Sequence, residues 1–440
     1  MNERTDSQVW AEIDRRLGEV ERFIPTQAVW RADADPPSAA SVHVVADRRA
    51  RRTTASSHRA ARRLALALLI VGLVVGLVGA MILVGGRQRT LPSDVRTTGS
   101  MTIGRIRQSA TLLTDGHVLI VGGDDPHGNA GPSSPSTAEL YDPVTGTFIA
   151  TGSLAAVAIP VVATPLGDGR VLVLRTDGSA DLYDPVTGRF AATGSMSVAR
   201  TGPSTTLLAD GRILVAGGGT RGGGPGSVGM TSAELYDPGT GRFSLTGSMT
   251  TPRRGPDATL LNDGRVLVVG SGTPGGSGPS AELYDPRTGR FTPTGNLVTP
   301  VDGTTVVRLR DGRVLLVGGS MPGTASEISA AELFDPATGT FGDVGWLRHP
   351  EIFVHATLLL DGRVLISGAG NAGPFSMELF DPGSATFSEI QGRATSPMWS
   401  SATLLADGDV LIAGGLANTG AILADAFLVD GHVPTASAAP

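Results

Sequence analysis

The sequence predicts an all-β fold, a seven-bladed β-propeller, preceded by a single transmembrane helix and a short cytoplasmic region. Two observations lead to this. An uncharged apolar segment occupies residues 64–86, and after it a unit of about 50 residues recurs seven times. Gly 61 and Pro 29 against 5% aromatic residues also favour a chain rich in turns over a helix-dominated enzyme.

Composition excludes several kinds of chemistry. With Cys 0 there is no disulfide framework, thiol nucleophile or Cys-ligated zinc. All 35 basic residues are Arg, so Schiff-base chemistry and a phosphate-loop lysine are excluded as well. Residues 87–440 carry 23 Arg and 32 acids, a net charge of −9. Nucleic acid is therefore not an expected partner.

The apolar segment is 23 residues long, LALALLIVGLVVGLVGAMILVGG. As a helix it would measure roughly 34 Å, enough to cross a hydrocarbon core of about 30 Å. Seven Arg between positions 48 and 63 precede it, against three between 87 and 96. This excess places residues 1–63 in the cytoplasm and residues 87–440 outside it, in a single-pass protein of the cell membrane. Small residues at Gly72, Gly76 and Ala80 would allow a homodimer through this helix.

The cytoplasmic region, residues 1–63, contains one amphipathic stretch. An apolar stripe with helical spacing predicts a short helix over residues 7–24, and residues 34–57 resemble a disordered basic tether. The stripe either packs on residues 25–33 or on the membrane surface, or it docks a cytoplasmic protein partner. Its residues are Trp10, Ile13, Leu17, Val20 and Ile24.

Each repeat predicts four strands, within a span of about 94 to 434. An Asp-Gly pair between two apolar runs predicts a two-residue hairpin of type I′, and Asp-Pro-x-Thr-Gly, as at residues 142–146, predicts a second tight turn. Four antiparallel strands cannot bury both faces alone, so the copies stack around an axis. The Asp-Gly pairs begin at Asp115, Asp168, Asp210, Asp263, Asp311, Asp361 and Asp407.

The seventh repeat lacks a convincing outer strand. Residues 94–101, however, match the outer-strand run of other repeats, such as residues 291–297. We expect this segment to pair with the last repeat and close the ring, which would leave no open edge.

The order of a Gly-Gly pair, an aromatic residue about 20 positions later and a second aromatic six or seven after that resembles the kelch repeat. Phe replaces the Trp that kelch repeats usually carry at the second aromatic position. The resemblance implies a propeller of a divergent bacterial type. The double glycines begin at Gly122, Gly217, Gly318 and Gly414; the aromatic pairs are Tyr141 and Phe148, Tyr183 and Phe190, Tyr236 and Phe243, Tyr284 and Phe291, Phe334 and Phe341, and Phe380 and Phe387.

The same resemblance includes galactose oxidase, whose copper centre needs a Tyr crosslinked to Cys, a second Tyr and two His. Cys 0 excludes that mechanism. The four Tyr all belong to the repeat motif, and an acid recurs once in each of six repeats, which is typical of structural positions. We therefore expect no cofactor, no metal and no enzymatic activity. The recurring acids are Glu139, Asp181, Glu234, Glu282, Glu332 and Glu378.

Ligand contacts are expected on the face that carries the variable loops and the connections between repeats, opposite the Asp-Gly turns. Arginines are unevenly distributed there, and they could surround an anionic ligand or be solvated surface charges. Arg175 is unusual because it stands where other repeats have the double glycine. The candidate ligand-binding residues are Arg105, Arg107, Arg175, Arg200, Arg253 and Arg254.

These features predict a membrane-anchored extracytoplasmic binding module for a protein or glycan ligand on the loop face of the propeller. The alternative is a transmembrane signalling regulator, with the propeller as sensor and an architecture like that of an anti-sigma factor. An extracytoplasmic carbohydrate-active enzyme is a third reading.

Overall fold

The computed structural model describes residues 94–123, 136–154, 160–220, 228–270, 280–299, 301, 303–321, 327–369, 377–390, 397–417 and 419–432. The chain divides into two units, Met1–Leu91 and Pro92–Pro440, and all described residues belong to the second. The amphipathic stretch, the tether and the apolar segment at 64–86 lie outside the described residues. Within the described residues no helix has the length and apolar character needed to cross a bilayer.

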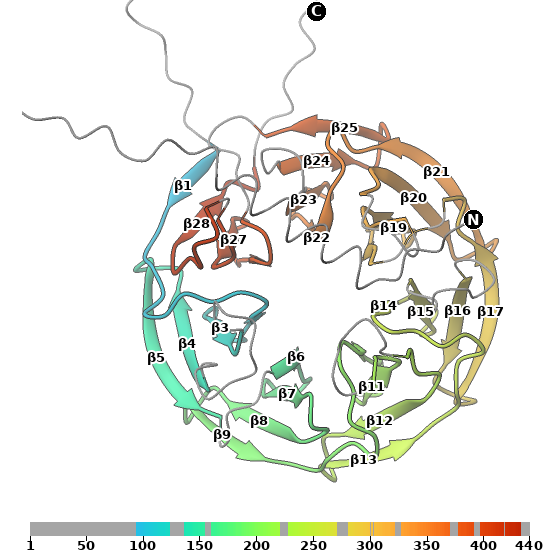
Figure 1. Cartoon of the computed structure of the whole chain (residues 1–440), viewed down its shortest axis with the longest axis horizontal. Helices are drawn as coiled ribbons and strands as arrows, with labels where there is room; N and C mark the ends of the chain where they lie inside the picture. Colours follow the sequence, from blue (N-terminus) through green and yellow to red (C-terminus); the bar gives the residue numbers. More distant parts are fainter. Residues whose placement is uncertain are drawn as a thin grey trace, which may run out of the picture. The chain divides into compact units, whose positions relative to one another are not determined.

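The second unit is a ring of seven antiparallel four-stranded sheets, the blades, so the predicted all-β seven-bladed propeller is confirmed (Figure 1). In the first six blades the strands run in sequence order from the centre outwards. Blade 1 contains β2 (Ser109–Leu112), β3 (Val118–Val121), β4 (Thr137–Asp142) and β5 (Thr147–Ser153). Blade 2 contains β6 (Pro160–Pro165), β7 (Val171–Arg175), β8 (Ala180–Asp184) and β9 (Arg189–Ala192). Blade 3 contains β10 (Ser204–Leu207), β11 (Ile213–Ala216), β12 (Ala233–Asp237) and β13 (Arg242–Leu245).

The remaining blades follow the same plan, except that the last takes its outer strand from the start of the domain. Blade 4 contains β14 (Asp257–Leu260), β15 (Val266–Val269), β16 (Ser280–Asp285) and β17 (Arg290–Asn296). Blade 5 contains β18 (Thr305–Arg308), β19 (Val314–Val317), β20 (Ala330–Asp335) and β21 (Thr340–Trp346). Blade 6 contains β22 (Ile352–Leu358), β23 (Val364–Ala369), β24 (Met377–Asp381) and β25 (Thr386–Glu389). Blade 7 contains β26 (Ser401–Leu404), β27 (Val410–Ala413), β28 (Ala426–Val429) and β1 (Val95–Thr97).

The hydrophobic core lies between the blades. The second strand of a blade is apolar on both faces, and in β3 all four residues are buried. Successive residues point to opposite neighbours: Val118 packs with blade 7, whereas Leu119 packs with blade 2. The outer strand β5 has exposed and partly buried positions but no fully buried one, because only one of its faces is covered.

Ring closure occurs as predicted. β1 pairs antiparallel with β28 in the register Val95↔Val429, Arg96↔Leu428 and Thr97↔Phe427. Figure 1 shows β1 beside β28 at the outside of the last blade, although the two lie at opposite ends of the described sequence. A buried cluster that includes Val118 and Leu411 joins blades 7 and 1. Closure therefore rests on both strand pairing and core packing.

The Asp-Gly turns differ from the predicted type I′ hairpin. In blade 1 the amide of Gly116 donates to the carbonyl of Leu113, the amide of Leu113 donates to that of His117, and of the turn residues only Gly116 has positive φ, 91°. This is a three-residue turn that ends in a left-handed glycine. Asp115 instead accepts the amide of His117 with its side chain, at 3.1 Å. Asp is favoured at this position because its carboxylate forms this bond, and it does not adopt a positive φ.

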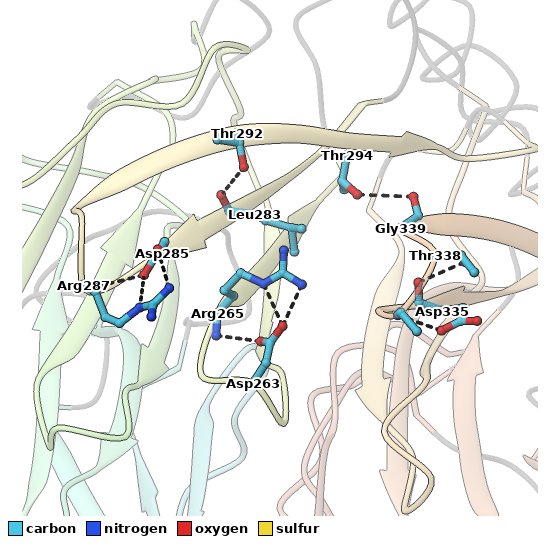
Figure 2. A network of polar contacts seen from close by, with 11 residues as sticks. Asp263, Arg265, Leu283, Asp285, Arg287, Thr292, Thr294, Asp335, Thr338 and Gly339 are labelled. Carbon is cyan, nitrogen blue, oxygen red and sulfur yellow. Dashed lines mark hydrogen bonds and ion pairs between the residues drawn. The ribbon is translucent and has the colours of Figure 1, made fainter.

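The Asp-Pro-x-Thr-Gly turns form as expected, with Gly289 at φ 66° and its amide bonded to the carbonyl of Asp285. Figure 2 shows this turn face in blade 4, where the Asp263 carboxylate meets the Arg265 guanidinium at 2.6 Å. It also shows Thr294 reaching across to the carbonyl of Gly339 in blade 5. Both kinds of turn lie at one end of the sheets, called here the turn face. The variable loops and the blade connections share the other end, called here the loop face.

The aromatic residues hold neighbouring blades together. Tyr141 is fully buried, lies 4.9 Å from the ring of Phe148, and shares a hydrogen bond of 2.8 Å with Thr98 of the preceding blade. The same Thr–Tyr bond recurs at the next three blade junctions. The expectation that the tyrosines are packing residues between blades is confirmed. The other pairs are Thr151 with Tyr183, Thr193 with Tyr236, and Thr246 with Tyr284.

Candidate functional site

Three of the six candidate arginines form a buried structural motif. Arg105, Arg200 and Arg253 each stand four residues before the inner strand of their blade, and each is 0% exposed. In each case Nη1 donates to a backbone carbonyl at the end of the second strand, at 2.8–2.9 Å. Nη2 meets the recurring acid of the same blade, at 3.0, 3.0 and 3.3 Å for Glu139, Glu234 and Glu282 respectively. Burial lowers the pKa of Arg105 and Arg253.

These three side chains have no surface that a ligand in solvent could reach in this structure. Each one ties the connection that enters its blade to the third strand, and the buried acid neutralises the guanidinium. The prediction had treated the arginines as surface groups and the acids as a separate structural position. The structure shows that the two are halves of one ion pair.

Arg175 completes the same kind of pair by another route. Blade 2 carries Ala158 at the sequence position of the buried arginine, and the recurring acid is Asp181. Arg175, at the end of β7 and 7% exposed, places Nη1 3.3 Å from Asp181 and donates from Nε to Ser179 at 2.6 Å. The unusual arginine that replaces a glycine therefore has a structural partner, the acid of its own blade.

Backbone amides also cap the acid. In blades 1, 3 and 4 they do so in addition to the arginine, whereas in blades 5 and 6 the described residues provide amides alone. In blade 5, Glu332 accepts the amides of Val298 and Thr299, at 2.9 and 2.6 Å. In blade 6, Glu378 accepts the amide of Arg348 at 2.9 Å, and burial raises its pKa.

The two remaining candidates, Arg107 and Arg254, are exposed on the loop face. Arg107 lies at the junction of blades 7 and 1, with its guanidinium carbon 4.3 Å from the ring centroid of Trp399. Its amide also donates to the carbonyl of Trp399, at 3.0 Å. The indole positions the guanidinium at the surface, and a planar guanidinium can bind a carboxylate or sulfate through two hydrogen bonds.

Backbone strain marks this same contact. Arg107 has φ 54° and Trp399 has φ 58°, and these are two of the three non-glycine residues with positive φ among those described. Such conformations cost about 1–3 kcal/mol and collect at functional sites. Sequence reasoning missed Trp399; its signal is a Trp in a blade connection, away from the aromatic positions of the repeat.

The inner strands carry a second set of polar groups near the loop face. Ser109, Asp257, Thr305 and His355 occupy the same register position, and each side chain bonds to the backbone of the following blade. Asp257 accepts the amide of Val306 at 2.9 Å, and burial raises its pKa to about 6. His355 donates from Nε2 to the carbonyl of Ser400 at 2.6 Å, and burial lowers its pKa. The remaining bonds join Ser109 to Ala163 and Thr305 to Val354.

No family model and no curated protein matches this sequence. Solved structures do match, among them a fungal alcohol oxidase of the AA5 family in complex with copper. The two share 19% identity and superpose with a TM-score of 0.60, over 77% of this chain and 75% of the other. At this identity the likeness shows a shared propeller fold.

The copper centre that the galactose-oxidase resemblance implies does not fit the residues present. The chain has no Cys for the crosslink, and the hydroxyls of Tyr141, Tyr183, Tyr236 and Tyr284 are bonded to threonines between blades. The structure describes four histidines. His355 is bonded to a backbone carbonyl on an inner strand, His349 lies in the connection between blades 5 and 6 with Nε2 3.5 Å from Glu389, and His117 and His432 belong to the opposite, turn face.

The prediction that this chain is not an enzyme is corrected by the comparison. It relied on a missing catalytic motif, yet a solved protein with the same fold is an alcohol oxidase, so this architecture does support catalysis. What is established is the seven-bladed β-propeller, a fold that the chain shares with an oxidase of the AA5 family.

Proposed function

We propose that the propeller recognises an anionic glycan on its loop face, at the junction of blades 7 and 1, with Arg107 and Trp399 at the centre of the site. The stacked, strained pair is the observation that supports this most strongly. Its guanidinium suits a carboxylate or sulfate group, and the partly exposed indole offers apolar surface on which a sugar ring can pack.

Arg254 extends the proposal to blade 4. It is exposed on the loop face, whereas its neighbour Arg253 is committed to Glu282. Arg254 lies three residues before the inner strand of blade 4, and the residue at the same position in blade 1 is the buried Ile106. Blade 4 therefore presents a charge where blade 1 buries an apolar side chain. An extended, repeatedly charged ligand that spans the loop face could contact Arg107 and Arg254 together.

Binding to an array of acidic and neutral glycans tests the proposal with the purified full-length chain. Acidic glycans should bind, and Arg107→Ala and Trp399→Ala should each weaken binding at least tenfold, about 1.4 kcal/mol. Arg287→Ala is the matched control, because Arg287 is an exposed arginine on the turn face, with 88% of its side chain accessible. Equal binding by the wild type and Arg107→Ala would contradict the proposal.

The proposed setting is a membrane. Residues 64–86 would anchor the chain with residues 1–63 in the cytoplasm, and the Arg excess before the segment supports this orientation. The stripe from Trp10 to Ile24 would then be available to a cytoplasmic protein. A reporter fused after Pro440 should be active only outside the cytoplasm, and activity inside would refute the orientation.

A further inference from the structure

The turn face of blade 7 brings together two carboxylates and an imidazole. Asp409 follows the Asp-Gly turn that leads into β27, and Asp430 and His432 follow β28. One ligand atom from each of the three lies within 4.8 Å of the others. The donors of one divalent ion bonded at about 2.0–2.3 Å lie at most about 4.6 Å apart, so the three atoms are close to the spacing that one ion requires.

Comparison between the blades shows that this arrangement depends on substitutions in the last repeat. At the position of Asp409 the other blades carry a basic residue, which pairs with the Asp of its own turn. Blade 7 carries an acid there, and Arg96 of β1 supplies the cation to it from outside the turn. The residues at the corresponding position are His117, Arg170, Arg212, Arg265, Arg313 and Arg363.

The imidazole of His432 lies beside the Asp-Gly turn, with 62% of its side chain exposed. Gly408 has φ 97°, and a Cβ at this residue would lie 2.6 Å from Cε1 of His432. The amide of His432 donates to Oδ1 of Asp430 at 2.8 Å, and its Nδ1 lies 3.4 Å from the same oxygen. Two turns of the chain therefore meet at a glycine, which leaves room for the imidazole beside the turn.

Charge also favours a cation. Asp407, Asp409 and Asp430 contribute three negative charges, and Arg96 is the cation that pairs with Asp409. Arg96 meets Oδ2 of Asp409, which leaves Oδ1 as the oxygen that can face a metal ion. A set of one imidazole and two carboxylates suits Zn²⁺ and related divalent transition ions, with water in the remaining positions.

We propose that Asp409, Asp430 and His432 bind a divalent transition metal ion of the zinc class where the ring closes. The ion would link the start of β27 to the end of β28, and Asp409 would at the same time hold Arg96 of β1. Metal binding would therefore stabilise the closed ring. This proposal stands independently of the glycan site on the opposite face.

Calorimetric titration of the chelator-treated full-length chain with ZnCl₂ tests it. The wild type should bind one more ion than His432→Ala does, and Asp430→Asn should weaken that site at least tenfold. His117→Ala is the control, because His117 also lies beside one acid on the turn face, with 3.3 Å between its Nδ1 and Oδ2 of Asp115, and 32% of its side chain is exposed against 62% for His432. It should bind as the wild type does.

Two further readouts separate a metal site from a structural role. Zn²⁺ should raise the melting temperature of the wild type and of His117→Ala, but not that of His432→Ala, whose metal-free melting temperature should equal that of the wild type because His432 is exposed. The visible spectrum of bound Co²⁺ should differ from that of the wild type in His432→Ala and Asp430→Asn, and should be unchanged in His117→Ala. Wild-type Zn²⁺ binding by His432→Ala, or no binding by the wild type at millimolar Zn²⁺, would overturn the proposal.

Discussion

At the scale of single residues, burial decides what an arginine does in this protein. Arg105 and Arg107 are two positions apart, yet one is 0% exposed against Glu139 and the other lies on Trp399 at the surface. The sequence indicated arginines in the blade connections but could not separate these roles. The partner of Arg105 lies 34 residues further along the chain, and Trp399 comes from the other end of the domain.

Asp257 predicts a pH dependence of stability. Burial raises its pKa to about 6 from 3.8, so the folded state holds this proton more tightly than the unfolded state. The free energy of unfolding should therefore fall as pH rises from about 4 to about 6, by roughly 3 kcal/mol. Asp257→Asn can still accept the amide of Val306 and removes the buried charge. This variant should match the wild type near pH 4 and exceed it in stability above about pH 6.

Denaturant unfolding of wild type and Asp257→Asn at several pH values measures this difference. Asp285→Asn is a suitable control, since the exposed Asp285 carboxyl has its pKa lowered by hydrogen bonds from Arg287. That variant should lack the crossover. If the free energy of unfolding varied with pH in parallel for the wild type and Asp257→Asn, Asp257 would not be the group responsible for the pH dependence.

At the scale of the blade, the recurring acid must be neutralised or capped, and the chain does this in different ways. Blades 1, 3 and 4 use an arginine before the inner strand, blade 2 uses Arg175, and blade 5 uses two backbone amides at Glu332. Blade 7 has neither the arginine nor the acid: Pro397 stands at the arginine position and Phe427 at the acid position. The turns were easier to predict than this pairing because their residues are adjacent in sequence.

Blade 2 offers a direct test of this rule. Arg175→Gly restores the glycine of other blades but leaves Asp181 buried without its cation, which should cost about 3–5 kcal/mol of unfolding free energy. Adding Ala158→Arg and Asp181→Glu rebuilds the pair of blades 1, 3 and 4 and should recover most of that loss. Thermal melting of the single and triple variants measures both changes. A single variant as stable as the wild type would show that the pair contributes nothing.

At the scale of the whole molecule, stability depends on joining the two ends of the domain. β1 completes blade 7, and Arg96 pairs with Asp409 across the junction. The sequence predicted this closure because the last repeat lacks an outer strand while residues 94–101 resemble one. It also predicted the number of blades and the placing of the turns, since each repeat gives the same local signal again. The contact between Arg107 and Trp399 could not be predicted in this way, because its two residues come from opposite ends of the domain and meet only when the ring closes.

Arg96→Pro should disrupt this closure. Proline removes the amide at the centre of the β1–β28 ladder, whereas Arg96→Ala removes only a partly exposed ion pair. The proline variant should therefore melt clearly below the alanine variant, and the alanine variant should remain within about 1 kcal/mol of the wild type. Equal melting of the two variants would mean that β1 is not needed to close the ring.

The most direct test of the proposed recognition site is a crystal structure of the protein with an acidic oligosaccharide identified by its binding. The account predicts a carboxylate or sulfate group within hydrogen-bonding distance of the Arg107 guanidinium, on the loop face between blades 7 and 1, with Trp399 beside the ligand. A ligand bound on the turn face, or on the loop face away from both Arg107 and Trp399, would contradict it.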